Sequence, residues 1–151
     1  ETKKVDESRT PDILFIERCL DLLKPGGRMA IVLPDGILGN NGLEYVRQYI
    51  LNNADIVAII DCPVESFLPS TDTKTSLLIL KKKKREGLPQ TFDTFMAIAK
   101  TCGHDRRGKE IYVRDENGDP VIVDGSAMID DDFVEITRRL VKHVKSRNIY
   151  N

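Results

Sequence analysis

The amino-acid sequence predicts an α/β fold in which parallel strands, joined by crossover helices, are completed by one antiparallel strand. Three observations predict it. Segments with helical spacing of apolar residues alternate with short apolar runs along the first half of the chain. These runs are almost wholly apolar and rich in β-branched residues, as in strands that are covered on both faces. The last run follows its predecessor after only a loop, which is too short for a parallel return.

The first predicted helix begins at Pro11. Thr10 stands at the N-cap position, Pro11 has no N–H to leave unpaired, and Asp12 places a negative charge in the first turn. The sequence KPGG then ends the helix. Its inward face is predicted to consist of Ile13, Ile16, Leu20 and Leu23.

The first predicted strand is residues 28–34 (RMAIVLP), which Pro34 ends. A second helix is predicted over residues 43–53 (LEYVRQYILNN), and its spacing turns Leu43, Val46, Ile50 and Leu51 inward. The second strand, residues 56–61 (IVAIID), is predicted to lie beside the first strand and parallel to it. The third strand, residues 75–80 (TSLLIL), is predicted to pair antiparallel with the second.

The character of the sequence changes near Gly87, and we expect two domains, residues 1–86 and residues 87–151. The second part is predicted to be an appended α+β segment. It has a short helix over 91–100, a hairpin over 110–125 that turns at Asn117 and Gly118, and a helix over 130–148. The acidic triplet Asp130 to Asp132 is predicted to cap that last helix.

The charge balance excludes a global positive field, because 23 Lys and Arg residues oppose 24 Asp and Glu residues. Any contact with DNA must then come from a local patch or from a partner. Three cysteines at wide spacing, with no CxxC pair, are typical of reduced thiols in a cytosolic protein. No apolar stretch approaches the roughly 18 residues that span a bilayer, and a cytoplasmic location is expected.

A glycine-rich segment, GILGNNG, follows the first predicted strand. Its glycines Gly36, Gly39 and Gly42 have the spacing G-x-x-G-x-x-G, not the G-x-G-x-x-G of dinucleotide-binding turns. One interpretation is a weak nucleotide site. The other is that the glycines, with Asn40 and Asn41, supply positive φ angles for a loop.

Residues 14–84 together resemble the second half of the catalytic domain of modification subunits of type I restriction systems. The specific parts are LKPGGRMAIVLPDGIL and F-x-P-S-T-x-x-K-T-S-L-L-x-L-K, two blocks in the right order and separation. The downstream segment DTFMAIAKTCGHDRRGK is also similar. This family comprises adenine-specific DNA methyltransferases that use S-adenosylmethionine. The resemblance implies a partial Rossmann-like methyltransferase fold whose last strand runs antiparallel, and it makes the glycine segment a rim loop of the active site.

Two elements of that family are absent from the sequence. The S-adenosylmethionine motif, a string like F-x-G-x-G, and the Asn-Pro-Pro-Phe/Tyr clamp for the flipped base both precede this region in the family, and neither occurs here. The chain is therefore interpreted as a fragment without methyltransferase activity of its own. No catalytic residue and no metal site are predicted within it.

The resemblance implies accessory contacts with the target base or the DNA. Phe67 matches the position of an aromatic or apolar face that stacks on the extruded adenine, although a phenylalanine in such a loop also serves as a core plug. Pro34 and Asp35 follow a strand at the ligand edge, and Asp35 either bonds near the substrate or caps the turn. Ser70, Thr71 and Lys74 are candidates for phosphate contact or ordinary turn residues.

Two basic clusters are candidates for sequence-independent contact with DNA phosphates. For the first cluster the alternatives are a solvated strand exit or a guard against edge aggregation. The candidates are Lys82, Lys83, Lys84 and Arg85 in the first cluster and Arg106 and Arg107 in the second.

For the intact protein the resemblance implies methyl transfer to the exocyclic amine of adenine in double-stranded DNA. The implied partners are the specificity subunit, which selects the DNA sequence, and the restriction subunit. An open sheet edge also predicts self-association of the chain. Two alternatives remain open: a non-catalytic protein-interaction module with a methylase-like half fold, and a nucleotide-binding Rossmann protein.

Overall fold

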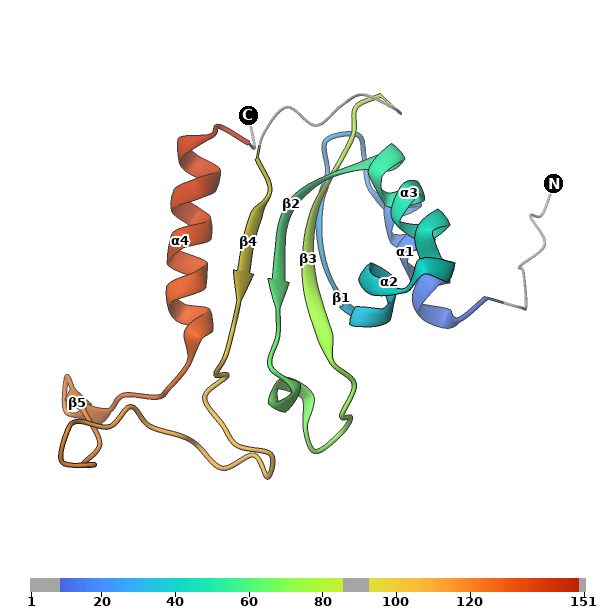
Figure 1. Ribbon diagram of the computed structural model, residues 1–151. Coiled ribbons are helices and arrows are strands. Elements are labelled where there is room, and N and C mark those ends of the chain that lie inside the picture. The colour runs from blue at the N-terminus through green and yellow to red at the C-terminus, as the bar shows by residue number, and fades with distance from the viewer. Residues whose placement is uncertain (1–8, 86–92, 150–151) are drawn as a thin grey trace.

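The computed structural model describes residues 9–85 and 93–149. Within these ranges the chain forms a four-stranded mixed sheet with helices on both faces, as the sequence predicts for an α/β fold. Helices α1, α2 and α3 lie on one side of the sheet and α4 on the other (Figure 1).

Helices and strands alternate along the first half of the chain, and the described part of the second half contains three short strands followed by one long helix. They are α1 (Pro11–Leu22), β1 (Arg28–Pro34), α2 (Asp35–Gly39), the 3₁₀ helix η1 (Asn41–Leu43), α3 (Glu44–Asn53), β2 (Ala54–Asp61), the 3₁₀ helix η2 (Val64–Phe67), β3 (Thr75–Lys82), β4 (Phe95–Ile98), β5 (Ile122–Val123), β6 (Ser126–Ala127) and α4 (Asp132–Ser146).

Helices α1 and α3 lie where the apolar spacing predicts them. Ile16, Leu20, Val46 and Ile50 are each at most 2% exposed and pack on the sheet. Thr10 is the N-cap residue of α1, but its side chain makes no capping hydrogen bond. Leu51 was predicted to face inward and is instead 44% exposed, because it lies off the stripe that Val46 and Ile50 define.

The glycine-rich segment forms the short helix α2 followed by η1. The interpretation in which its glycines, with Asn40 and Asn41, supply positive φ angles is wrong, because none of these residues is among those with positive φ. The turn between the two helices is made by Asn40 instead, whose side-chain oxygen accepts a hydrogen bond of 2.8 Å from the N–H of Gly42. An Asn side chain that caps its own turn removes the need for a left-handed residue.

The strand order of the main sheet is β1-β3-β2-β4. Strand β3 is antiparallel to β2, as predicted, and it is also antiparallel to β1. Strands β1 and β2 therefore run in the same direction, but the prediction that they lie side by side is wrong, because β3 lies between them. Leu78 and Leu80 of β3 are 0% exposed, which fits a strand that is paired on both edges.

The position of β3 follows from the lengths of the connections. Helix α3 carries the chain over one face of the sheet, so β2 can begin one strand position away from β1. The short connection from β2 then returns the chain antiparallel into the remaining space, where β3 pairs from Arg28↔Lys81 to Pro34↔Thr75 with β1. Every residue of β1 is thus paired with a residue of β3 along the edge that faces β3.

Strand β1 was predicted to be covered on both faces, and it is covered on one. Leu33 is 2% exposed beneath the α1–α3 layer, whereas Val32 on the opposite face is 45% exposed. Helix α4 packs over β2, β3 and β4, and does not extend to this outer strand. Strand β1 is at the end of the sheet order, and self-association through such an edge remains a prediction.

Residues 91–100 were predicted to form a short helix, and the described part of this segment forms strand β4 instead. It pairs parallel with β2, from Ala58↔Phe95 to Asp61↔Ile98. Its side chains alternate: Phe95 and Ala97 pack against α4, while Met96 and Ile98 are 71% and 70% exposed. Five apolar residues in succession are compatible with the period of a helix and with that of a strand. The segment forms a strand because it pairs with the free edge of β2.

The second half of the chain is therefore not only an appended segment. Both β4 and α4 belong to the layers of the main sheet, and the sheet takes strands from both sides of residue 86. The predicted boundary at 86 and 87 itself lies outside the described residues. Whether it separates two domains remains a prediction.

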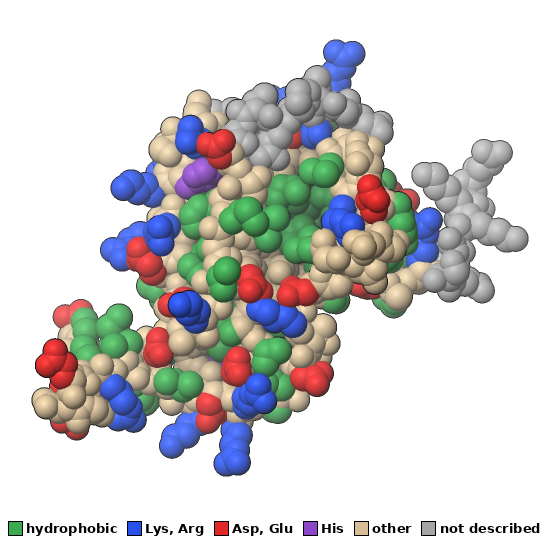
Figure 2. Space-filling model, in the orientation of Figure 1, with side chains coloured by type: hydrophobic (Ala, Val, Ile, Leu, Met, Phe, Trp, Pro, Cys, Tyr) green, Lys and Arg blue, Asp and Glu red, His purple; other side chains and the backbone are tan. Residues whose placement is uncertain are grey.

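Residues 111–129, which we call the arm, protrude from the body near the N-terminal end of α4 (Figures 1 and 2). The predicted turn at Asn117 and Gly118 is present. The N–H of Gly118 donates to Asp115 O, and Arg114 and Pro120 form an antiparallel β-bridge across the turn. A second turn at Asp124 and Gly125, which joins β5 to β6, was not predicted.

The predicted last helix is α4, and the acidic triplet caps it as expected. Asp131 is the N-cap residue, and its carboxylate accepts a hydrogen bond of 2.8 Å from the N–H of Phe133. In the parts of the chain that the structure describes, no helix is long and apolar enough to cross a membrane.

Candidate functional site

Polar side chains from three strands converge at one edge of the main sheet. Strands β1 and β2 end there, at Pro34 and Asp61, and the antiparallel strand β3 begins there at Thr75. The carboxyl ends of parallel strands are where open α/β sheets bind ligands. We call this the carboxyl edge.

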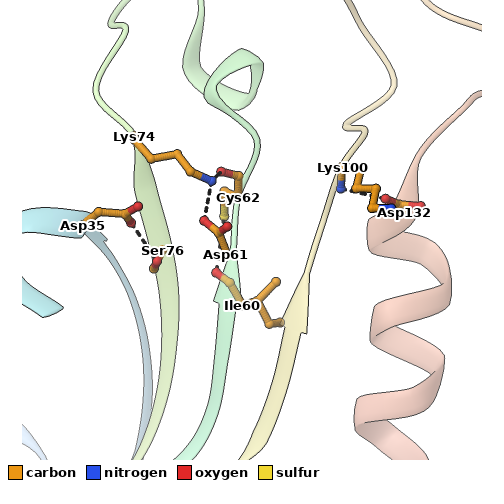
Figure 3. Close-up of polar contacts among 8 residues, drawn as sticks. All are labelled: Asp35, Ile60, Asp61, Cys62, Lys74, Ser76, Lys100 and Asp132. Carbon is orange, nitrogen blue, oxygen red and sulfur yellow. Dashed lines mark hydrogen bonds and ion pairs between the residues drawn. The ribbon is translucent and has the colours of Figure 1, made fainter. Parts of the chain in front are cut away.

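Asp35, directly after β1, is held by the start of β3. Its Oδ1 accepts a hydrogen bond of 2.8 Å from Ser76 Oγ, and its N–H donates to Lys74 O at 3.0 Å. Figure 3 shows the two side chains pointing toward each other across the β1–β3 ladder. Pro34, the preceding residue, is half-buried and closes β1. The Asp35 carboxylate is thereby oriented at the edge.

Lys74 joins β2 to β3 at the same edge. Its ammonium donates to the Asp61 carboxylate and to Cys62 O (Figure 3). The side chains of Lys74 and Asp61 are 40% and 33% exposed, so this ion pair is partly accessible to solvent. An exposed pair of this kind adds little stability. The pair places one positive and one negative charge at the carboxyl edge.

Phe67 ends the 3₁₀ helix η2, in the connection between β2 and β3. Its side chain is 39% exposed and belongs to none of the hydrophobic clusters of the described residues, which does not fit the core-plug interpretation. Ser70 and Thr71 follow it and are exposed. The N–H of Thr71 donates to Phe67 O, and its hydroxyl bonds Thr73 Oγ1 at 2.9 Å, which are turn contacts.

Two lysines of the first basic cluster bind backbone carbonyls at the C-terminal ends of two helices. Lys82 Nζ donates to Leu20 O and Leu23 O at 2.7 and 2.8 Å, and Lys83 Nζ donates to Leu51 O at 2.6 Å. Cations at these positions satisfy the last carbonyls of α1 and α3 and complement the helix dipoles. Lys84 and Arg85 are exposed. Of the four predicted phosphate contacts, these two are the ones with side chains directed to solvent.

The second basic cluster lies beside η2. Arg106 Nε forms an ion pair of 3.2 Å with Glu65, which links the loop of residues 99–110 to η2. The N–H of Glu65's own backbone, and then Arg106, lower the pKa of the Glu65 carboxyl. Arg107 is exposed, and its backbone N–H donates to Asp105. The structure thus brings Arg106, but not Lys82 to Arg85, to the η2 connection.

A cavity of 260 Å³ lies between that loop and η2. Sequence reasoning did not identify it, because its walls come from segments more than 30 residues apart. The C-x-H spacing of Cys102 and His104 was the available signal. The lining residues are Glu65, Lys100, Thr101, Cys102, Gly103, His104, Asp105, Arg106, Ile111 and Asp130.

Hydrogen bonds to carboxylates hold the loop around this cavity. Asp132 accepts from the N–H groups of Lys100 and Thr101 at 2.7 and 3.3 Å, which ties the loop to the start of α4 (Figure 3). The N–H groups of Lys109 and Arg107 both donate to Asp105 and lower the pKa of its carboxyl. Among the residues that the structure describes, no three His, Cys, Asp or Glu side chains are grouped to hold a metal ion.

Individual relatives match parts of the chain. The methylase subunit of the Escherichia coli type I restriction enzyme EcoEI is 30% identical over 77 residues, which are 50% of this chain and 16% of that subunit. The chain thus spans about one sixth of the length of this relative.

Solved structures also match parts of it. A Listeria monocytogenes protein assigned to the class I S-adenosylmethionine-dependent methyltransferases is 30% identical, with a TM-score of 0.48 over 57% of this chain and 26% of that protein. A chain of a type I restriction-modification system gives 24% identity and a TM-score of 0.47, over 61% of this chain and 18% of that one. A Vibrio vulnificus protein assigned as a type I modification subunit is 24% identical, with a TM-score of 0.43. The match covers 56% of this chain and 21% of that protein.

The family model described as N-6 DNA Methylase matches residues 1–131. The match includes the carboxyl edge, η2, β4 and the arm, and it extends well beyond the segment 14–84 in which the sequence resemblance is dense. It covers most of the chain. The chain belongs to the N-6 DNA methylase family.

Proposed function

We propose that this chain is part of the modification subunit of a type I restriction-modification system. The longer protein would transfer a methyl group from S-adenosylmethionine to the exocyclic amine of adenine in double-stranded DNA. Family membership and the similarity to the EcoEI methylase subunit support the proposal. Because the chain spans 16% of that relative, the activity is assigned to the longer protein and not to these residues.

The observation that carries the proposal is an exposed aromatic ring beside oriented polar groups at the carboxyl edge. Phe67 is 39% exposed, and the same edge holds the Asp35–Ser76 hydrogen bond. An enzyme that modifies a base in duplex DNA extrudes it and stacks it against an aromatic or apolar side chain. Phe67 would supply that face, and Asp35 would stand where a polar group could orient the base.

The residues of this edge do not fit S-adenosylmethionine. The polar side chains are paired with one another, as Asp35 is with Ser76 and Lys74 with Asp61. The nearby cavity, at 260 Å³, is smaller than the roughly 300 to 1,000 Å³ of pockets that enclose ligands of this size. We therefore assign no step of cofactor binding to this chain. Calorimetric titration should detect no S-adenosylmethionine binding to the 151-residue chain.

The stacking role is tested in the longer protein encoded by the source gene. Phe67→Ala should weaken the complex with the extruded base by about 1 to 3 kcal/mol, the usual loss when one stacked base is released. With 2-aminopurine at the target position, the variant should lose the change in fluorescence that accompanies stacking. Phe67→Tyr retains the ring and should retain that change.

Phe15 provides the matched control, since it is an exposed phenylalanine, 62% accessible, on α1 and not in the connection between β2 and β3. Phe15→Ala should leave both methyl transfer and the fluorescence change intact. Equal behaviour of Phe67→Ala and Phe15→Ala would contradict the role of Phe67. It would leave the family assignment unaffected.

Partner proteins are proposed to dock on the outer face of α4 and the arm. Val134 and Val141 are 71% and 46% exposed and lie seven residues apart, on one side of the helix. The specificity subunit is the proposed partner. Val134→Lys combined with Val141→Lys should then reduce its co-purification with the longer protein, while Lys142→Ala on the same helix should not.

A further inference from the structure

Cys102 and His104 form a close pair at the wall of the 260 Å³ cavity. The Cys102 Sγ lies 3.7 Å from His104 Nε2 and 3.8 Å from His104 O. The thiol is half-buried, and the cavity opens beside it. A thiol proton therefore has an imidazole nitrogen within reach of a sulfur hydrogen bond.

The other ring nitrogen determines which tautomer meets the thiol. His104 Nδ1 lies 3.0 Å from Asp105 O, and a carbonyl oxygen can only accept a hydrogen bond. Nδ1 must then carry the proton in the neutral ring, and Nε2 presents a lone pair to Cys102. This arrangement allows His104 to accept the thiol proton, as imidazoles do for nucleophilic cysteines.

The carboxylates around the pair have hydrogen-bond partners other than the imidazole. Asp105 is occupied by the backbone N–H groups of Arg107 and Lys109, and Asp130 accepts from Thr101 Oγ1. Glu65 is paired with Arg106. The cavity volume is several times the roughly 30 Å³ that one water molecule takes in the liquid, so a small molecule can reach the sulfur.

The chain contains an internal contrast in Cys62. Its side chain is buried, its thiol lies 3.7 Å from Ile60 O, and burial raises the pKa of that thiol. Accessibility and thiolate character together govern reactivity. Cys62 is inaccessible and its thiolate form is disfavoured, whereas Cys102 lines a cavity and has an imidazole nitrogen beside its sulfur.

We propose that Cys102 is a site of reversible oxidation by small hydroperoxides, with His104 as the group that takes its proton. The sulfur, as thiolate, attacks one peroxide oxygen; the S–O bond forms and the O–O bond breaks. Sulfur loses two electrons and becomes a sulfenic acid, and the peroxide is reduced. The leaving hydroxide, or alkoxide, receives the proton held by His104 and departs as water or an alcohol. The added oxygen occupies the cavity beside η2.

The test uses the longer protein encoded by the source gene and hydrogen peroxide, with the sulfenic acid trapped by dimedone and each cysteine quantified by peptide mass spectrometry. Cys102 should be trapped about tenfold faster, or more, than Cys62 and Cys19 in the same sample. Dithiothreitol added after oxidation but before dimedone should restore the thiol. Cys102 trapping no faster than that of Cys19 overturns the proposal.

His104→Asn tests the proton acceptor, since asparagine can hydrogen-bond but cannot take the proton at neutral pH. It should lower the rate at Cys102 by about tenfold. Slow reaction of Cys62 in the same variant shows that the fold is intact. Arg107→Ala, an exposed neighbour on the same loop, is the matched control and should leave the rate unchanged. An unchanged rate in His104→Asn, with Cys62 still protected, also overturns the proposal.

Discussion

The main sheet and the arm are stabilised in different ways. In the sheet, apolar side chains carry the structure: Leu33, Val57, Leu78 and Leu80 are at most 2% exposed and pack in the hydrophobic clusters beneath the helices. In the arm, the apolar side chains face solvent, with Ile122, Val123 and Met128 at 61%, 50% and 48% exposure.

The arm is instead organised by backbone and carboxylate hydrogen bonds. Asp115 accepts from the N–H groups of Asn117 and Asp119 at 2.9 Å each. At the junction with the preceding loop, the N–H of Ile111 donates to Gly103 O and the N–H of Asp130 to Ile111 O. Such bonds contribute about 1 kcal/mol net each, which is less than the burial of a large apolar side chain. The arm should therefore be the less stable region, with apolar surface available for a partner.

The largest expected effect is in the sheet. Leu78→Ala removes a side chain that is 0% exposed from the central strand β3 and should reduce the free energy of unfolding by about 2 to 5 kcal/mol. Ile122→Ala, in the arm, should change it by less than about 0.5 kcal/mol. Urea denaturation followed by circular dichroism measures both. Similar losses in the two variants would mean that the arm contributes to the core.

A medium effect is expected at Gly103, where the arm joins the loop. Its φ is +86°, and a Cβ there would lie 2.9 Å from Ile129 Cγ2. Gly103→Ala should reduce stability by more than the roughly 1 to 2 kcal/mol that a left-handed alanine costs. Gly108 has a φ of +79° and open space, so Gly108→Ala isolates the backbone effect.

The readout should separate the two regions. Hydrogen exchange of the Ile111 and Asp130 amides reports on the arm junction, and exchange of the Leu78 amide reports on the sheet. Faster exchange at the junction alone in Gly103→Ala would sharpen the contrast. Equal acceleration in both places would show that arm and sheet unfold as one unit.

The smallest effect is expected at a helix cap. Asp131 accepts from the N–H of Phe133 at the start of α4, and Asp131→Ala should reduce the free energy of unfolding by about 1 kcal/mol. Thr10 occupies the same position in α1 without a side-chain hydrogen bond, so Thr10→Ala should have almost no effect. Thermal unfolding of the two variants compares the caps directly.

The elements with strong local signals were predictable from the sequence. Helical spacing predicted the inward faces of α1 and α3, and the short apolar runs predicted β1, β2 and β3. The antiparallel direction of β3 followed from a short connection. Two motif blocks in the right order also indicated the family that the match over residues 1–131 shows.

The candidate site was predictable in part. Pro34 and Asp35 were predicted to be near the ligand edge from the end of their strand, and Asp35 lies there beside Ser76 and Lys74. Lys74 was predicted only as a phosphate contact or a turn residue, and its role toward DNA stays a prediction. The structural roles of Lys82 and Lys83 were not predictable, because the carbonyls they bind belong to helices 30 or more residues away. The cavity around Cys102 and His104 was missed for the same reason.

The sequence by itself determined the local elements with strong periodicity, and the family, because periodicity, turn chemistry and motif order depend on residues close together in the chain. Only the tertiary structure decided that β3 lies between β1 and β2, that FMAI is a strand and that η2 meets the loop of residues 99–110. These outcomes depend on which backbone edge is left unpaired and which surface is left uncovered once the sheet assembles. Segments far apart in the chain make that choice together.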